Sequence, residues 1–187
     1  KNLTLKFHNK LVGEIQIDAL ATKAPVYKRK WVRKKIKKSK LDIKKIRDVK
    51  FEDALIKVLS SPNHSNKSWV TNQYDQMVMG DTVQRSGSDA AIVRIHNKDK
   101  AIAVTVDSSA NYCKSQPKIG GKQIVCENWR NLISVGAKPL AITNCLNFGN
   151  PENKEIMGEF AECLEGIKEA CEFLNYPVVS GNVSFYN

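Results

Sequence analysis

The sequence has no long hydrophobic run, and this excludes a membrane-spanning helix. None of its apolar stretches approaches the ~18 residues that such a helix requires. No signal peptide is visible, because the opening residues KNLTLKFHNK contain no apolar core. They also lack an initial Met, so we expect the 187 residues to be a piece of a longer protein. We expect that protein to be cytoplasmic, with no membrane partner.

The sequence also lacks a cysteine pattern of the kind that holds a metal or a disulfide framework. It contains five cysteines, an odd number, and no two of them form a CxxC pair. This argues against a set of structural disulfides and against a thiolate zinc site. We therefore expect reduced thiols in or near the core of a cytosolic protein.

Net positive charge is absent outside one segment. Between Lys28 and Lys50 there are thirteen Lys or Arg and two Asp, a net charge of +11 that equals the net charge of the whole chain. A nucleic-acid site would use these cations to neutralise phosphates. Aromatic residues are few there, however, and no known nucleic-acid fold surrounds them. We favour a solvated basic linker over a nucleic-acid site.

The residues before this linker alternate between apolar and polar side chains. LTLKF and LVGEIQI predict two short strands with a turn near His8 and Asn9. A lone hairpin is marginal in water, so we expect it to belong to a larger sheet. Pro25 closes this part.

Two helices are predicted after the linker. FEDALIKVL, at 51–59, places apolar residues on one face and acidic residues in the first turn. A second helix is predicted over 67–78, with Asn66 or Ser65 as its cap. His64 has no second ligand at metal spacing, so we expect it to be a loop residue.

The remaining chain predicts strands that alternate with helices. Two strands form a hairpin around the turn NKDK, and then helix, strand, helix and strand follow. The predicted ranges are 90–96 and 101–107 for the hairpin, 121–137 and 150–174 for the helices, and 139–145 and 177–183 for the later strands. This order predicts an α/β (α+β) fold in which helices flank a mixed sheet.

Small and polar residues follow the predicted strands. In α/β folds ligands bind at such strand ends, where glycine allows the backbone to approach a phosphate. Asp107 ends one strand and suits a metal-bound phosphate, although a turn-forming Asp explains it equally well. Gly120 and Gly121 lie at a helix start and offer a possible anion site, which by itself is weak.

Five motifs from this region resemble a known family. GSDAAIVRI, TVDSSANY, IGGKQIV, VGAKPLAITNCLNFGNPE and VVSGNVSFYN are similar to the synthetase subunit of phosphoribosylformylglycinamidine synthase. The resemblance implies an aminoimidazole-ribonucleotide-synthetase-like N-terminal domain, the second copy in that enzyme, at 51–187. Residues 1–27 resemble the last strands of the preceding C-terminal-like domain, and 28–50 form the basic linker between the two.

The resemblance implies an ATP-dependent ligase of purine biosynthesis. The family converts formylglycinamide ribonucleotide to its amidine with ammonia from glutamine, and releases ADP and phosphate. The implied cofactors are ATP and Mg²⁺. The implied partners are the rest of the same enzyme, including its first synthetase-like domain, and a glutamine amidotransferase subunit or domain that supplies ammonia.

The resemblance also assigns site residues by position. Asn144 and Gly181 would contact ATP, with Asp107 as a further candidate for the nucleotide–metal site. Asn182 would ligate Mg²⁺, and Ser184 would hold the ribonucleotide substrate. Many family members carry Asp where Asn144 stands, so this chain has one negative charge fewer there.

The resemblance assigns no catalytic acid or base in this chain. None of its three histidines, at 8, 64 and 96, lies in a matching motif. We expect the chain by itself to be inactive and to supply one wall of a shared site. A structural half-domain that holds a nucleotide only for stability remains an alternative, as does a nucleic-acid-binding module.

Overall fold

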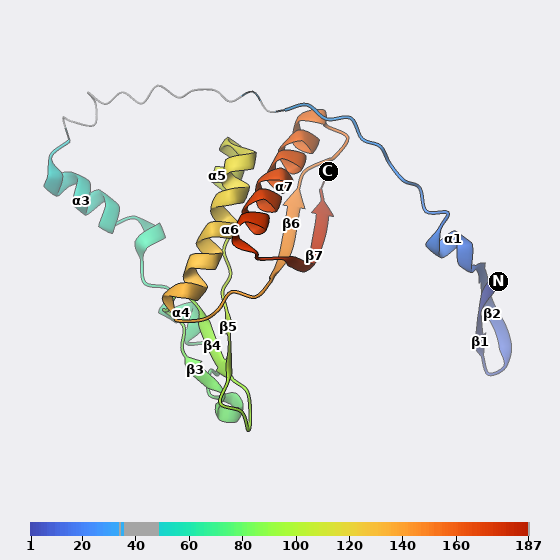
Figure 1. Cartoon of the computed structure of the whole chain (residues 1–187), viewed down its shortest axis with the longest axis horizontal. Helices are drawn as coiled ribbons and strands as arrows, with labels where there is room; N and C mark the ends of the chain where they lie inside the picture. Colours follow the sequence, from blue (N-terminus) through green and yellow to red (C-terminus); the bar gives the residue numbers. More distant parts are fainter. Residues whose placement is uncertain (34, 36–48, 187) are drawn as a thin grey trace. The chain divides into compact units, whose positions relative to one another are not determined.

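The computed structural model describes residues 1–33, 35 and 49–186, and these form two compact units, Lys1–Lys30 and Trp31–Asn187 (Figure 1). Most of the predicted basic linker, including all of its isoleucines, lies outside the described residues.

The first unit is the predicted hairpin followed by one short helix. β1 (Asn2–Phe7) pairs antiparallel with β2 (Lys10–Gln16), and α1 (Ile17–Ala21) follows directly. His8 and Asn9 form the turn with φ values of 45° and 63°. A positive φ at both central residues is the geometry of the tight turns that match the twist of paired strands. The predicted strands and turn are confirmed.

The second unit begins with helical segments that only partly match the prediction. α3 (Phe51–Leu59) has the predicted bounds. It is followed by η1 (Pro62–His64), α4 (Ser68–Thr71) and η2 (Val78–Gly80). The helix predicted over 67–78 is wrong beyond one turn, although Asn66 Oδ1 does accept a hydrogen bond from Ser68 N at its start.

Side chains explain why α4 stops so early. Asp75 Oδ1 accepts a hydrogen bond from Met77 N at 2.7 Å, and Gln73 Nε2 donates to Trp69 O at 3.0 Å. Both bonds compete with the backbone bonds that would continue the helix. The chain then turns into β3 (Thr82–Gln84), a short strand that the sequence did not predict.

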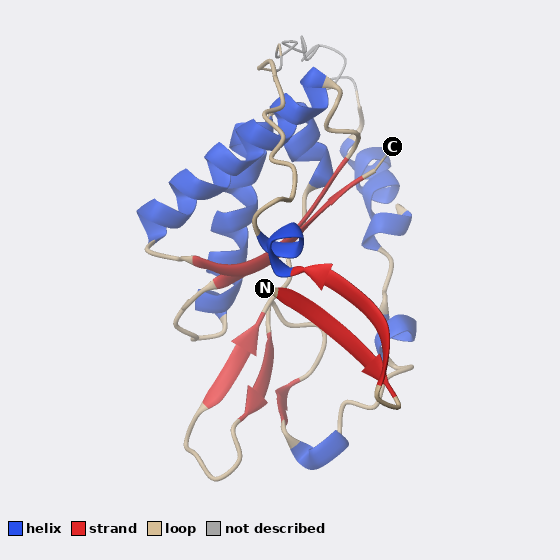
Figure 2. Ribbon diagram, turned by 90° about the vertical axis from the view of Figure 1, so that its right-hand side faces the viewer, coloured by secondary structure: helices blue, strands red, loops and turns tan. Residues whose placement is uncertain are grey.

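The strands of the second unit divide into an antiparallel and a parallel set. β3, β4 (Ala91–Arg94) and β5 (Ala101–Val104) form a three-stranded antiparallel sheet. β6 (Ile142–Phe148) and β7 (Val178–Phe185) form a separate parallel pair (Figure 2). The predicted α/β class is confirmed, and among the described residues its two kinds of pairing fall in different hydrogen-bonded sheets.

Two long helices carry the core. α5 (Ala110–Ser115) leads into α6 (Pro117–Ser134), and α7 (Lys154–Leu174) connects β6 to β7. Gly136, with φ of 77°, ends α6 as predicted, and Asn153 Oδ1 caps α7 by accepting from Glu155 N at 2.9 Å. The buried residues cluster where α6 and α7 pack together: Val125, Leu132, Cys163, Ile167, Ala170 and Cys171, with Ala90 and Tyr176 beside them.

Glycines allow these helices to approach closely. A Cβ on Gly121 would lie 2.5 Å from Cys163 O on α7, and a Cβ on Gly166 would overlap Lys118 O on α6. Gly120 N also donates to Gln116 O at 2.8 Å, so it is not a free helix-terminal donor. The possible anion site at Gly120 and Gly121 is therefore wrong. These glycines are packing residues, since interaxial distance depends on side-chain size at the contact.

Two residues of the basic run, Val32 and Arg33, pack against α7. Val32 N donates to Lys154 O at 3.2 Å, and a Cβ on Gly158 would overlap Val32 O. Arg33 donates to Glu162 at 3.3 Å and to Glu165 at 3.2 Å. At this point the chain lies on its own domain, and Arg33 is engaged there rather than free to bind phosphates.

Candidate functional site

The candidate site lies on the parallel strand pair β6–β7. Their register places Asn144 opposite Gly181, Cys145 opposite Asn182, and Asn147 opposite Ser184. The predicted strands, 139–145 and 177–183, left Asn147 and Ser184 beyond their ends, and those ends are wrong, because parallel pairing extends β6 to Phe148 and β7 to Phe185. Successive side chains of a strand point to opposite faces, so the strand register sorts the candidate residues into two sets.

One face of the pair packs against α7. Phe160 of α7 makes edge-to-face contacts with Phe148 and Phe185, both with ring centroids 5.2 Å apart. Ile142 and Leu146 pack against the core on the same side. This face is therefore the apolar side of the strands, half-buried along β6 and more exposed along β7.

Asn144 is the polar exception on the α7 face. It lies directly over Gly181, because a Cβ on Gly181 would overlap Asn144 Oδ1 and would lie 2.8 Å from Asn144 O. Gly181 thus leaves room for the Asn144 amide, a structural role that sequence reasoning did not foresee.

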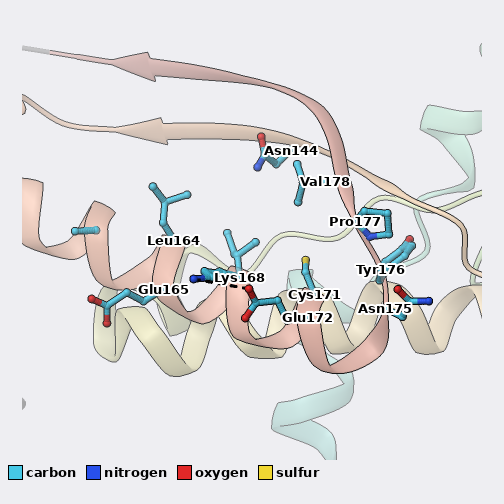
Figure 3. Close-up of a pocket in the computed structure, with 12 residues that line it drawn as sticks. Asn144, Leu164, Glu165, Lys168, Cys171, Glu172, Asn175, Tyr176, Pro177 and Val178 are labelled. Atoms are coloured by element: carbon cyan, nitrogen blue, oxygen red, sulfur yellow. Dashed lines mark ion pairs between the residues drawn. The ribbon is translucent and has the colours of Figure 1, made fainter. Parts of the chain in front are cut away.

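A groove of about 830 Å³ opens beside Asn144, between α7 and the early parts of β6 and β7. In Figure 3, Asn144 and Val178 project from the strands towards α7, and Lys168 and Glu172 form an ion pair of 3.7 Å on the helix. The remaining walls of the groove are mainly apolar. They comprise Ala161, Leu164, Glu165, Ile167, Cys171, Asn175, Tyr176 and Pro177.

The opposite, open face of the pair is polar. Asn182 Nδ2 donates a hydrogen bond to Ser184 Oγ at 3.0 Å, so the predicted metal ligand and substrate ligand are in contact. Asn182 is exposed and Ser184 is half-buried. Because the Ser184 hydroxyl accepts from Asn182, its own hydrogen remains available to a ligand, and Asn182 Oδ1 is available as an acceptor.

Sequence reasoning missed three further residues of this open face. Tyr186 OH donates to Asn147 Oδ1 at 3.1 Å, and Asn147 Nδ2 lies 3.3 Å from Cys145 O. The signal that could have found them is the alternation in TNCLNF, which places Cys145 and Asn147 on one face of a strand. A strand that ends at 145 leaves Asn147 in a turn, so the alternation of side chains between the two faces cannot be recognised there.

Asp107 lies in the loop between β5 and α5. Burial raises the pKa of its carboxyl group, and the nearby Glu127 raises it further, against lowering effects of Ser108 N–H and Arg130. Asp107 Oδ2 is buried without a hydrogen-bond partner among the residues that the structure describes. A desolvated carboxylate oxygen of this kind is costly unless something pairs with it. Within residues 1–33, 35 and 49–186, no hydrogen bond or ion pair joins Asp107 to β6 or β7.

A hydrogen-bond chain fixes the end of α7 relative to the Asp107 loop. Tyr176 OH donates to Asn128 Oδ1 at 2.8 Å, and Asn128 Nδ2 donates to Thr105 O at 3.3 Å. Tyr176 is only 2% exposed, so this chain is buried at one end. The connection holds the residues before Asp107 against α6.

Neither a complete metal cluster nor a membrane helix occurs in the described ranges. No group of three or more His, Cys, Asp or Glu is placed to hold a metal ion among those residues. The helices described at 1–33 and 49–186 are too short or too polar to cross a bilayer.

Comparisons with known proteins agree with the resemblance in the sequence. The chain is 55% identical over 188 residues to the phosphoribosylformylglycinamidine synthase subunit PurL of Pelagibacter ubique, covering 100% of this chain and 26% of that protein. It is 48% identical to the same subunit from Rhodopseudomonas palustris, covering 25% of that protein. The chain thus spans about a quarter of the length of the curated relatives that it matches.

Solved structures give the same result. PurL of Thermotoga maritima complexed with ATP is 33% identical, with a TM-score of 0.69 over 98% of this chain and 28% of that one. The same protein complexed with FGAR gives 34% identity and a TM-score of 0.68 over 98% of this chain and 27% of that one. The model of the AIR synthase related protein, N-terminal domain, matches residues 87–187, which is more than half of the chain. This chain therefore belongs to the AIR synthase related family, as a carrier of its N-terminal domain.

Proposed function

We propose that this chain is part of a phosphoribosylformylglycinamidine synthase, an ATP-dependent ligase that forms an amidine. The observation that carries the proposal is the end-to-end match to PurL subunits at 55% identity. In this reaction ATP phosphorylates the amide oxygen of formylglycinamide ribonucleotide, and ammonia derived from glutamine displaces the phosphate. The chemistry requires donors that hold the substrate in line and groups that offset phosphate charge.

The open face of β6–β7 supplies suitable groups for substrate and metal. Ser184 would donate its hydroxyl hydrogen to an oxygen of the ribonucleotide, oriented by the 3.0 Å bond from Asn182. Asn182 Oδ1 fits Mg²⁺ as a single neutral ligand, since Mg²⁺ prefers oxygen and usually keeps waters and substrate phosphates in its shell. When bound, Mg²⁺ would offset the charge of the transferring phosphate.

The remaining candidates would contact ATP. The orphan Oδ2 of Asp107 suits a cation or donor at the nucleotide–metal site, and the contact between Asn144 and Gly181 suits close approach of a nucleotide to backbone. These assignments remain predictions, as does the division into 1–27, 28–50 and 51–187. No residue of this chain is assigned as catalytic acid or base.

The proposal includes partners and a location. The rest of the same enzyme would complete the site, and a glutamine amidotransferase subunit or domain would supply ammonia. We place the enzyme in the cytoplasm. The 187 residues alone should be inactive, and formylglycinamide-ribonucleotide-dependent ADP release by them would contradict this.

The decisive test compares Asn182→Ala with wild type in the full-length protein. We expect ammonia-dependent ADP formation to fall ~100-fold or more, about 2.7 kcal/mol in the transition state, because a metal ligand and the partner of Ser184 are lost together. Asn182→Asp keeps an oxygen ligand and should recover part of the rate with a changed Mg²⁺ requirement. Thermal denaturation of each variant checks that the fold is intact.

An auxiliary nucleotide site is the second candidate function. The observation that favours it is that Asn144 and Gly181, the residues predicted to contact ATP, lie against each other, whereas no group of three or more His, Cys, Asp or Glu among the described residues is placed to hold a metal ion. An unchanged rate in Asn182→Ala, combined with lower thermal stability in the presence of ATP, would support the auxiliary site against the ligase role of this face.

A further inference from the structure

Two cysteines from distant parts of the chain meet between α5 and α7. Cys163 donates its S–H to Cys113 Sγ, with the sulfur atoms 3.8 Å apart and the two residues fifty positions apart in sequence. The pair is not a disulfide, and all five cysteines are free thiols. A disulfide needs sulfurs about 2 Å apart, so rotation of the two side chains and a small approach of the helices would close the gap.

The glycine pair of α6 explains why these two cysteines face each other. A Cβ on Gly120 would overlap the backbone N of Cys113, and a Cβ on Gly121 would lie 2.5 Å from Cys163 O. Because Gly120 and Gly121 have no side chains, α5 and α7 can both approach the backbone of α6 there. The backbones of both cysteines are therefore held by adjacent residues of one rigid helix, and the thiol pair is preorganised.

The two thiols differ in access and in acidity. Cys113 is half-buried, whereas Cys163 is only 3% exposed. The S–H bond donated by Cys163 lowers the pKa of Cys113 despite some opposing burial, and the same bond together with burial raises the pKa of Cys163. The thiolate is the reactive form of cysteine, so Cys113 is the nucleophile. Cys163 is the resolving cysteine.

We propose that Cys113 and Cys163 form an oxidation site at which a hydroperoxide converts the thiol pair to an intramolecular disulfide. The Cys113 thiolate attacks one oxygen of hydrogen peroxide, the O–O bond breaks, and Cys113 becomes a sulfenic acid as hydroxide leaves. The Cys163 sulfur then attacks the Cys113 sulfur, the S–O bond breaks, and the Cys163 proton leaves with that oxygen as water. Overall two thiols and one peroxide give one disulfide and two waters.

The disulfide would tie α5 to α7. α5 follows the loop that carries Asp107, and α7 is the connection between β6 and β7. Oxidation would therefore restrict the movement of α5 and the preceding Asp107 loop relative to α7. It would not alter any residue on the open face of β6–β7. This inference does not depend on the proposed ligase activity, because it concerns only the thiols.

The test treats the folded full-length protein with hydrogen peroxide and maps its cysteines by mass spectrometry. We expect a new Cys113–Cys163 cross-linked peptide, a loss of two titratable thiols per chain, and full reversal by dithiothreitol. Cys163→Ser should abolish the cross-link and leave Cys113 as a sulfenic acid that dimedone traps. Cys145→Ser is the matched control, because it removes an exposed cysteine of β6 and should leave the cross-link unchanged.

Two outcomes would overturn the proposal. One is a folded wild-type protein in which peroxide oxidises Cys145 while Cys113 and Cys163 stay reduced. The other is a cross-link from Cys113 or Cys163 to a different cysteine, such as Cys171 or Cys126. The wild-type peptide map decides between these results even if Cys163→Ser fails to fold.

Discussion

The two faces of the β6–β7 pair use the same strands for opposite purposes. The face towards α7 carries Ile142, Leu146, Phe148 and Phe185, and its aromatic rings pack around Phe160. The open face carries Asn147, Asn182, Ser184 and Tyr186, which bond to one another and to solvent-exposed backbone. Stability is concentrated on one face, and groups that can bind a ligand are concentrated on the other.

This difference shows how a strand pair can hold polar groups rigidly without burying them. Packing against α7 fixes the backbone, and the alternation of side chains then presents the polar set at fixed spacing on the far side. A one-residue slip of either strand would exchange the two sets. Variants on the α7 face should therefore lower stability, and variants on the open face should lower binding alone.

Phe160→Ala should have the largest effect on stability. Its ring contacts both Phe148 and Phe185, so its loss removes an aromatic contact that α7 makes with each strand. We expect a loss of about 3 kcal/mol, towards the low end for Phe→Ala because the ring is only half-buried. Native-state hydrogen exchange of the β6 and β7 amides in the full-length protein measures this loss of stability.

The control for Phe160 is Phe173→Ala, on the same helix. Phe173 is 88% exposed, so its loss should change stability by less than about 0.5 kcal/mol. Equal effects of the two substitutions would contradict the assignment of the α7 face as the stabilising one.

Gly181→Ala should have the next largest effect. The new methyl group would overlap the Asn144 amide, and we expect a loss of about 2 kcal/mol from overpacking. The backbone of Gly181 is not left-handed, so the cost is steric rather than conformational. Ser180→Ala, one residue earlier and on the opposite face, should be nearly neutral in the same exchange experiment.

Asn144→Ala in the Gly181→Ala background separates two explanations. If the steric contact with Asn144 causes the loss, removing the Asn144 side chain should restore most of the stability. No recovery would show that the methyl group clashes with the backbone oxygen of Asn144, 2.8 Å from the added Cβ, and that the amide is not the cause.

Glu169→Gln should have the smallest effect, and the effect should be present at neutral pH and fade in acid. Glu169 pairs with Lys118 at 2.5 Å and with Lys122 at 2.6 Å, which joins α7 to α6. These hydrogen bonds lower the pKa of Glu169 to about 2. Because its pKa is lower in the folded state, Glu169 contributes stability above the usual carboxyl pKa of 4.5 and loses that contribution as the pH falls towards 2.

Urea unfolding at pH 7 and pH 3 checks this expectation. The difference between the two midpoints should be smaller in Glu169→Gln than in wild type. Glu172→Gln is the matched control, because Glu172 pairs with Lys168 within α7 at 3.7 Å and does not join two helices. If all three proteins respond equally to pH, the ion pairs of Glu169 between α6 and α7 do not contribute to stability.

Elements with strong local signals were predicted well. α3 has its predicted bounds because its apolar spacing and acidic first turn both indicate a helix, and Gly136 ends α6 because a positive φ favours glycine. Predictions failed where side chains compete with the backbone, as at Asp75, or where tertiary pairing lengthens a strand, as at Phe148. The role of Gly120 and Gly121 could not be predicted, because a glycine that admits a second helix has the same sequence signal as one that binds an anion.

The sequence alone determined the order of strands and helices, the confinement of charge to one segment and, through its motifs, the family. These properties depend on local periodicity and on residue identity. Only the tertiary structure decided which face each polar residue occupies, that Asn182 contacts Ser184, and that Cys113 meets Cys163 across the glycines of α6. Those properties depend on strand register and on the distance between helices, which are set by contacts between residues far apart in the chain.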